Sequence, residues 1–249
     1  MPKDESVFSL ANSMAFAMIS SSLLSIHVPD AGEVSALALT PDRPRFGYVF
    51  AHGAGAGMTH AHMEAMAQAL ARRDVATLRF QFPFMEQGKK RTDPPAVAQA
   101  AVRAAVMAAG LRWPRLALFA GGKSFGGRMT SQAQADQPLA GVLGLAFIGF
   151  PLHPAGKPST ARAAHLAHVR CPLLFLQGTR DELADLELLR QALAPLGAGA
   201  TLHLEHDADH AFHTRKSSGR NDGQVIESMC DAMATWFTDV HSRAQKDGA

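Results

Sequence analysis

Short runs of apolar residues, each bounded by glycine, proline or charged residues, recur along the chain. Runs of this length and setting are typical of strands buried inside a sheet. They cover residues 46–51, 75–82, 116–120, 141–150, 173–177 and 200–205. Two further segments, 22–28 and 33–39, flank the turn sequence Pro-Asp-Ala-Gly and predict an antiparallel hairpin at an edge of the sheet.

Segments with helical periodicity separate most of these runs. The predicted helices cover about residues 59–73, 93–110, 124–135, 182–196 and 222–242. In the last of them, apolar residues such as Val225, Met229 and Met233 recur at helical spacing, which indicates one side packed against the core. Strands that alternate with helices predict an α/β fold, with a mainly parallel sheet and helices on both faces. Ligands bind such sheets outside the carboxyl ends of the strands.

Length and composition fit a single domain. With 249 residues, 47% of them hydrophobic, the chain can fill a large core. We predict that residues 18–249 form one domain and that residues 1–17 are an N-terminal extension that can be disordered.

Charge and cysteine content indicate which partners and which cellular compartment suit the protein. A net charge of +2 arises from mixed acidic and basic residues, so composition calls for neither nucleic acid nor an anionic membrane as partner. Cys171 and Cys230 are too few for a disulfide framework and lack metal-ligand spacing, as expected in a reducing cytosol. No segment has the roughly 18 consecutive apolar residues that span a bilayer. We expect a cytoplasmic protein, and the sequence leaves its oligomeric state open.

The apolar run at 116–120 leads directly into Gly122-Lys-Ser-Phe-Gly126, which fits the pattern G-x-S-x-G. Glycine on both sides of the serine lets the chain reverse from strand to helix at close quarters. The hydroxyl of Ser124 would then stand exposed on a strained turn. A phosphate-binding loop would need glycine at position 117, which is alanine, so a nucleophile is the favoured interpretation. A glycine-rich turn of some other α/β protein is the alternative.

A serine hydroxyl is a poor nucleophile at neutral pH, so it needs a general base, and the base needs an orienting carboxylate. Asp181 follows the predicted strand at 173–177, and His210 follows the strand at 200–205. Ser124, Asp181 and His210 thus occur in the chain order that a nucleophile on such a turn uses. Asp181 could instead cap the helix predicted at 182–196.

Four histidines follow one another closely near the predicted strand at 200–205, and they permit a second interpretation as metal ligands. They are His203, His206, His210 and His213. No carboxylate-rich second cluster accompanies them, whereas Ser124 and Asp181 account for one histidine without a metal. We therefore predict neither a metal nor a cofactor.

The negative charge that develops on a substrate carbonyl oxygen needs hydrogen-bond donors. We expect the backbone N–H groups of Phe125, just after the nucleophile, and of Ala54 to supply them, with Gly55 as the fallback donor. Ala54 belongs to the glycine-rich stretch that follows the strand at 46–51. A simple strand end is the alternative for that stretch.

Six stretches carry a resemblance that covers about residues 22–240. They are Ala51-His-Gly-Ala-Gly55, Phe80-Gln-Phe-Pro-Phe84, Gly122-Lys-Ser-Phe-Gly-Gly-Arg-Met129, Phe150-Pro-Leu-His-Pro154, Gln177-Gly-Thr-Arg-Asp181 and Asp209-His-Ala-Phe212. Together they resemble a short α/β-hydrolase subfamily related to dienelactone hydrolases. The resemblance implies the α/β-hydrolase fold and a triad of Ser124, Asp181 and His210, and it favours His210 over its neighbours. Dienelactone hydrolases use cysteine as nucleophile, so Ser124 favours ordinary ester chemistry.

The connections suggest an open site with a basic mouth. Only about twenty residues separate the strands predicted at 141–150 and 173–177, too few for a lid domain. Several basic residues lie in segments at the carboxyl edge of the sheet, which favours an anionic ester as substrate. Lys123, Arg180 and Arg215 are the candidate substrate-binding residues among them.

These observations predict a serine hydrolase of the carboxylesterase or thioesterase type that acts on a small-molecule ester. Ser124 would attack, His210 would take and return the proton, and Asp181 would orient His210. Acyl transfer, which uses the same acyl-enzyme, is a second enzymatic possibility. A non-catalytic hydrolase-fold module for binding or scaffolding is the alternative from another class, because some relatives are non-catalytic subunits of larger assemblies.

Overall fold

The computed structural model describes residues 19–247, so the predicted extension 1–17 lies outside the described residues. Within them, eight strands form one sheet in the order β1-β2-β4-β3-β5-β6-β7-β8. The strands are β1 (Ile19–Val28), β2 (Gly32–Pro41), β3 (Phe46–Ala51), β4 (Val75–Phe80), β5 (Ala117–Lys123), β6 (Val142–Ile148), β7 (Leu173–Gly178) and β8 (Ala200–Glu205). The β1–β2 hairpin lies at one edge, β2 pairs antiparallel with β4, and every other pairing is parallel.

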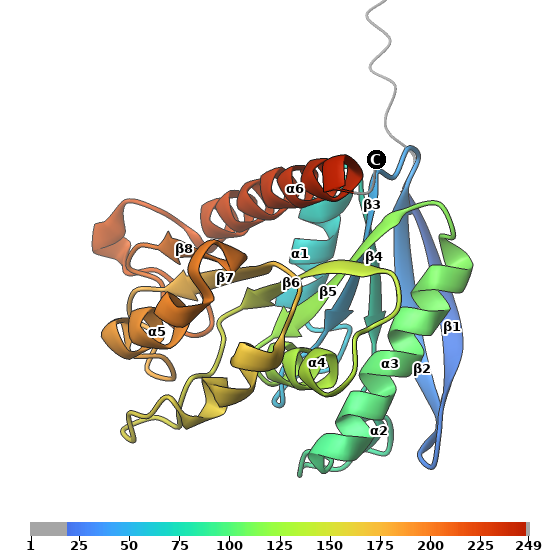
Figure 1. The fold of residues 1–249 in the computed structure, drawn as a ribbon, viewed down its shortest axis with the longest axis horizontal. Helices are drawn as coiled ribbons and strands as arrows, with labels where there is room; N and C mark the ends of the chain where they lie inside the picture. The colour runs from blue at the N-terminus through green and yellow to red at the C-terminus, as the bar shows by residue number, and fades with distance from the viewer. Residues whose placement is uncertain (1–18, 248–249) are drawn as a thin grey trace, which may run out of the picture.

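Helices cover both faces of the sheet (Figure 1). The α-helices are α1 (Ala61–Ala71), α2 (Pro83–Glu86), α3 (Pro95–Arg112), α4 (Phe125–Asp136), α5 (Leu186–Leu193) and α6 (Asp222–Asp247). Three 3₁₀ segments, η1 (Ala161–His168), η2 (Ala194–Gly199) and η3 (Lys216–Ser218), complete the set. Helices α1 and α6 pack together on one face, and α3, α4 and η1 pack on the other. The predicted α/β fold, a mainly parallel sheet with helices on both faces, is therefore confirmed.

The core explains why the strands read as continuous apolar runs. All six residues of β3 are buried because both faces of that strand are covered. Phe46 belongs to the same buried cluster as Met229 of α6. Val49 belongs to the other cluster, with Val102 of α3. The apolar side of the last helix thus packs against the core as its spacing predicts.

The connection from β6 to β7 holds only η1 and loop, so within residues 19–247 no lid domain covers the carboxyl ends of the strands.

Several helix ends differ from the prediction. Helix α3 continues past Gly110 to Arg112, where the next residue, Trp113, is buried. Helix α5 begins at Leu186, because Asp185 accepts the hydrogen bond from the Leu188 N–H and caps it.

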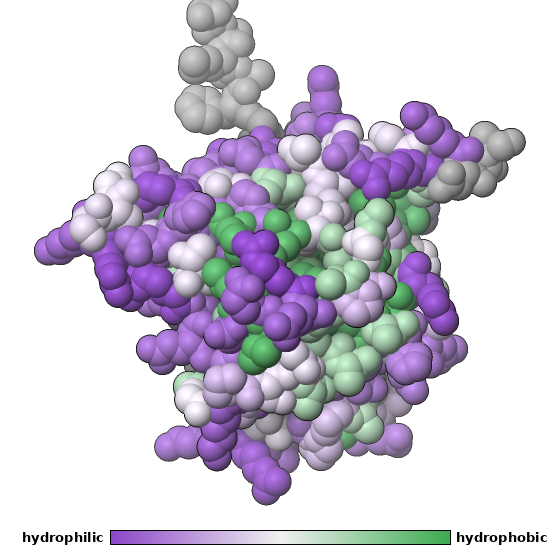
Figure 2. Space-filling view, turned by 60° about the vertical axis from the view of Figure 1, so that its left-hand side comes forward, coloured by the Kyte–Doolittle hydropathy of each residue, from purple (hydrophilic) through white to green (hydrophobic). Residues whose placement is uncertain are grey.

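Hydrophilic residues cover much of the face in Figure 2, with smaller apolar groups between them. In the described part of the chain, no helix combines the length and the apolar character needed to cross a bilayer.

Candidate active site

Ser124 stands on a sharp turn between β5 and α4. Its backbone has φ 49° and ψ −113°, a left-handed conformation that residues other than glycine rarely adopt. The two glycines of the motif lie so close to neighbouring backbone that a side chain has no room at either position. A Cβ on Gly122 would lie 2.4 Å from the Ala51 carbonyl oxygen, and one on Gly126 would lie 2.5 Å from the His52 carbonyl oxygen. The strain in a backbone conformation like that of Ser124 is of the order of 1–3 kcal/mol. At many functional sites the surrounding structure holds a residue in such a conformation.

Three side chains from the ends of three strands meet at this turn. Nε2 of His210, in the segment after β8, lies 2.9 Å from Ser124 Oγ. Nδ1 of the same ring lies 2.7 Å from Oδ2 of Asp181, in the segment after β7. The Asp181 side chain is fully buried, and the His210 side chain is 26% exposed. A buried carboxylate at Nδ1 favours the tautomer that keeps Nε2 free to accept the serine proton.

Gln177 holds Asp181 in place, and sequence reasoning did not assign it this role. Its side-chain amide donates to Asp181 Oδ2, and its Oε1 accepts a hydrogen bond from the Phe150 N–H at 3.0 Å. The Leu183 N–H donates to Asp181 Oδ1 at 2.8 Å. Asp181 therefore does not cap α5 as the alternative interpretation had it. A polar residue in an otherwise apolar strand, four positions before the aspartate, is the signal that could have identified Gln177.

The loop after β3 is fixed by His52, which is fully buried. Its Nδ1 lies 2.7 Å from the Gly53 carbonyl oxygen, and its Nε2 accepts the Phe82 N–H at 3.0 Å. Burial lowers the pKa of His52 to about 4, so the ring is neutral and donates through Nδ1. The next residues of the loop, Ala54 and Gly55, line a cavity that also contains Ser124.

Phe125 is the first residue of α4, and the first N–H groups of a helix have no acceptor within it. The amide of Phe125 follows Ser124 directly in the chain. An amide in this position can donate to an oxyanion on the serine adduct. The proposed pairing of Phe125 with Ala54 or Gly55 stays a prediction.

The cavity beside Ser124 has a volume of about 620 Å³. Its walls come from the loop after β3, the start of α1, the segment that carries His210 and the start of α6. A more open groove of about 1120 Å³ lies between α6 and β8, and none of the predicted site residues lines it.

The three candidate substrate-binding residues lie in different places. Lys123 lines the cavity, where its Nζ donates to the His210 carbonyl oxygen at 2.6 Å. Arg180 donates to the Asp207 carbonyl oxygen at 3.1 Å and does not line the cavity. Arg215 is exposed just before η3 and does not line it either.

Two of the other histidines near β8, His203 and His213, have carboxylate partners of their own. Nε2 of His203 lies 2.9 Å from Glu205, and Nδ1 of His213 lies 2.6 Å from Asp222. In residues 19–247, no three His, Cys, Asp or Glu side chains converge in a way that could hold a metal ion.

A second serine–histidine contact, which the sequence did not indicate, lies seven residues further along. Ser131 Oγ, in α4, is 2.7 Å from Nε2 of His165, in η1. Ser131 is fully buried, and its hydroxyl also contacts the Arg128 carbonyl oxygen at 2.9 Å. No hydrogen bond or ion pair joins His165 to a carboxylate in the described residues, and neither residue lines the cavity beside Ser124.

Comparison with known proteins identifies proteins with a related fold. The model of a family described as "Alpha/beta hydrolase domain" matches residues 44–238. XC6422 from Xanthomonas campestris, described as a serine hydrolase without a lid, superimposes with a TM-score of 0.70 at 22% identity, covering 87% of this chain and 94% of its own. A dienelactone hydrolase from Anabaena variabilis gives a TM-score of 0.69 at 19% identity over 89% and 98% of the two chains. An esterase domain from Rhodothermus marinus gives 0.67 at 16% identity over 87% and 97%. At these identities the likeness to the solved structures is one of fold.

Proposed function

The chain belongs to the α/β-hydrolase domain family, and on that premise we propose that it is a serine hydrolase that cleaves a carboxylic ester or thioester. One observation carries the proposal: Ser124 Oγ lies 2.9 Å from a histidine whose other ring nitrogen contacts a buried carboxylate. That arrangement supplies the base and the orienting group that a serine nucleophile requires.

In the first half of the reaction, Ser124 Oγ bonds to the carbonyl carbon of the substrate while His210 Nε2 takes the hydroxyl proton. Asp181 stabilises the imidazolium that forms. The carbonyl oxygen becomes an oxyanion, which accepts hydrogen bonds from the amides of Phe125 and of Ala54 or Gly55. When the tetrahedral intermediate collapses, the bond to the alcohol or thiol breaks, and His210 returns the proton to that leaving group.

In the second half, water attacks the acyl-enzyme, again with His210 as the base, and releases the acid and free Ser124. Because no lid domain covers the cavity in residues 19–247, water and other acceptors can reach the acyl-enzyme from solvent. Formation of a new ester with an added alcohol, in competition with hydrolysis, would show acyl transfer by the same route. The neighbours described as esterases support ester chemistry without identifying an acyl or leaving group.

Labelling with a fluorophosphonate, followed by intact-mass measurement, tests the proposal. We expect one adduct on the wild type, none on Ser124→Ala, and strongly slowed labelling of His210→Ala. Ser131→Ala is the matched control and should label like the wild type. Failure of folded wild-type protein to label would contradict an activated serine and would favour the non-catalytic binding module.

A further inference from the structure

The cavity beside Ser124 carries four nitrogen bases that the proposed mechanism does not use. One of them, His60, accepts the His62 N–H at its Nδ1, 3.2 Å away, and caps α1. The other three, Lys123, His62 and His213, are called here the basic cluster. Asp222 is the only carboxylate among the described residues that line the cavity. The rest of the wall is largely apolar, with side chains such as Met63, Phe212 and Ile226.

Lys123 lacks a counter-ion at hydrogen-bond distance. Its ammonium donates to the His210 carbonyl oxygen and lies 5.4 Å from the centre of the Phe212 ring. Within residues 19–247, no carboxylate lies within 4.0 Å of it. An ammonium has three N–H donors, so two remain for another acceptor. A partly buried cation without a paired anion is costly, and an anionic ligand would offset that cost.

The two histidines add donors on the same cavity. His62 packs against Phe212, with ring centres 6.0 Å apart, and its Nε2 is buried without a hydrogen-bond partner in the described structure. His213 points Nδ1 at Asp222, which leaves Nε2 free for a ligand. The hydrogen bond to Asp222 raises the pKa of His213, so the pair favours a charged imidazolium.

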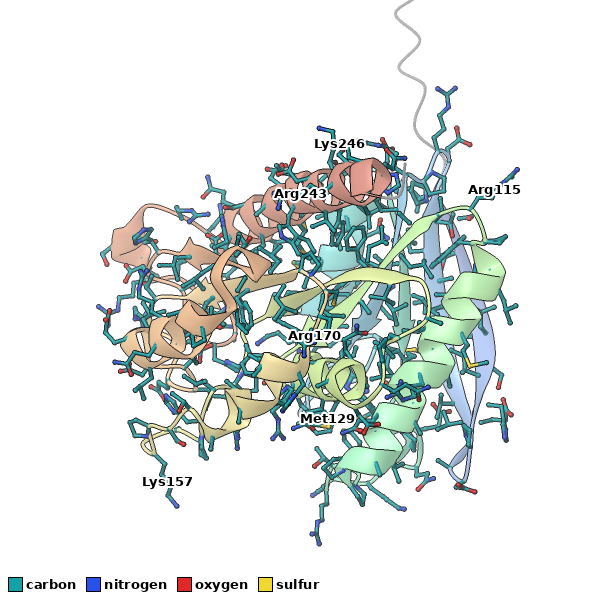
Figure 3. All side chains as sticks on the ribbon, viewed as in Figure 1. Arg115, Met129, Lys157, Arg170, Arg243 and Lys246 are labelled. Carbon is teal, nitrogen blue, oxygen red and sulfur yellow. The ribbon has the colours of Figure 1, made fainter. Side chains whose placement is uncertain are left out.

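We propose that the basic cluster binds an anionic oxygen group, a carboxylate or a phosphate, on the substrate whose scissile carbonyl lies at Ser124. This inference rests on the proposed function. Of the three basic residues predicted to bind an anionic substrate, it retains Lys123, which lines the cavity, and it adds His62 and His213. Other basic side chains lie on the outside of the molecule: in Figure 3, Lys157 projects from the loop after β6, and Arg243 and Lys246 lie on α6.

Pairs of esters that match in length and differ in charge test the proposal. One pair is the 4-nitrophenyl monoester of glutaric acid and 4-nitrophenyl pentanoate, with a phosphonate-ended analogue as a third member. A second pair places the carboxylate on the leaving group, as acetyl esters of 4-hydroxybenzoate and of phenol. We expect kcat/KM to favour the acidic member of at least one pair by about tenfold or more at pH 7, because hydrogen bonds between ionised groups are stronger than those between neutral groups.

Lys123→Met should bring the ratio of acidic to neutral kcat/KM close to one. The ratio is the informative quantity, because loss of the bond to the His210 carbonyl slows both substrates alike. His213→Gln should lower the ratio in part. Lys157→Met removes the same charge from an exposed position outside the cavity, so it should leave the ratio unchanged.

The ratio should also fall as the pH rises through about 8. Desolvation lowers the pKa of Lys123 to about 8, although the carboxylates of Asp181 and Asp209 act in the opposite direction. Lys123 is therefore cationic below that pH and neutral above it, and the nearby His62 is already neutral, because burial lowers its pKa to about 4.

The outcomes separate this inference from the proposed function. Protein that reacts with a fluorophosphonate yet hydrolyses both members of each pair equally would overturn the anionic subsite and leave the serine hydrolase intact. An acidic preference that survives Lys123→Met and His213→Gln would also overturn it. Protein that neither labels nor hydrolyses any ester would contradict both proposals.

Discussion

Two serines near α4 each contact the Nε2 atom of a histidine, at almost the same distance. Ser124 lies 2.9 Å from His210, and Ser131 lies 2.7 Å from His165. The surroundings of the two histidines differ. His210 has a buried carboxylate at its second nitrogen, whereas the pKa of His165 is lowered to about 4 by burial and by the nearby Arg128 guanidinium.

The comparison teaches that a short serine–histidine distance does not by itself make a nucleophile. Ser124 occupies a left-handed turn and lines a cavity of about 620 Å³. Ser131 lies within α4, is fully buried, and shares its hydroxyl with the Arg128 carbonyl. The positive charge of a protonated His165 would be opposed by the nearby Arg128. The positive charge of a protonated His210 would be stabilised by Asp181. Only the first pair has access, a counter-ion and space for a substrate.

The sharpest test removes each serine in turn. Ser124→Ala should lower kcat for a 4-nitrophenyl ester by about 10⁶-fold, the loss expected when a triad nucleophile is removed. Ser131→Ala should keep kcat within a few-fold of the wild type. Substantial turnover by folded Ser124→Ala would show that another group carries out the reaction and would remove the contrast between the two pairs.

The next test removes the carboxylate that distinguishes the pairs. Asp181→Asn should lower kcat by about 10⁴-fold, because an amide favours the wrong tautomer of His210. Crystal structures or backbone chemical shifts would check that the loop keeps its shape. His165→Ala is the counterpart in the second pair and should leave kcat unchanged. A modest loss in Asp181→Asn would contradict the orienting role proposed for Asp181.

The loop after β3 lines the cavity beside Ser124, and removing a single N–H tests whether that loop supplies an oxyanion donor. Ala54→Pro deletes the amide that is expected to donate to the oxyanion, and should lower kcat by about 10²–10³-fold with little change in KM. Gly55→Pro is the matched comparison. If Gly55→Pro has the larger effect in protein with a wild-type circular dichroism spectrum, Gly55 is the donor and Ala54 is not.

The sequence predicts the fold well because the strands are buried on both faces. Phe46–Ala51 is found as a strand with the predicted limits, and its six residues are all buried. Helix limits are less well predicted, since they depend on local hydrogen bonds. The sequence offers Asp181 as an alternative cap for the helix predicted at 182–196. In the structure Asp181 contacts His210 instead, and Asp185 caps α5 by accepting the Leu188 N–H.

For the site, the sequence orders Ser124, Asp181 and His210 along three strands, and the parallel sheet brings the strand ends to one edge. Periodicity cannot show which polar side chains share a space. For that reason the contacts of Gln177 with Asp181 and of Lys123 with the His210 carbonyl appear only in three dimensions. The catalytic roles themselves stay predictions until labelling and kinetics test them.

The smallest expected effect concerns stability, and it comes from the second pair. The pKa of His165 is about 4 in the folded protein and close to 6.5 in an unfolded chain, so the unfolded chain binds more protons between these values. The contribution of His165 to the free energy of unfolding is therefore complete above about pH 6.5 and is lost as the pH falls toward 4. His52 and His62 act in the same direction, because burial lowers the pKa of each to about 4.

Replacement of His165 by glutamine should therefore make the loss of stability in acid less steep. Each proton taken up only on unfolding changes the free energy of unfolding by at most about 1.4 kcal/mol per pH unit. Urea unfolding of the wild type and of His165→Gln, at intervals from pH 4.5 to 7, measures that slope. The variant should retain the part contributed by His52 and His62. Equal slopes would mean that His165 takes up its proton without unfolding, and the second pair would then be far less buried than its contacts with Ser131 indicate.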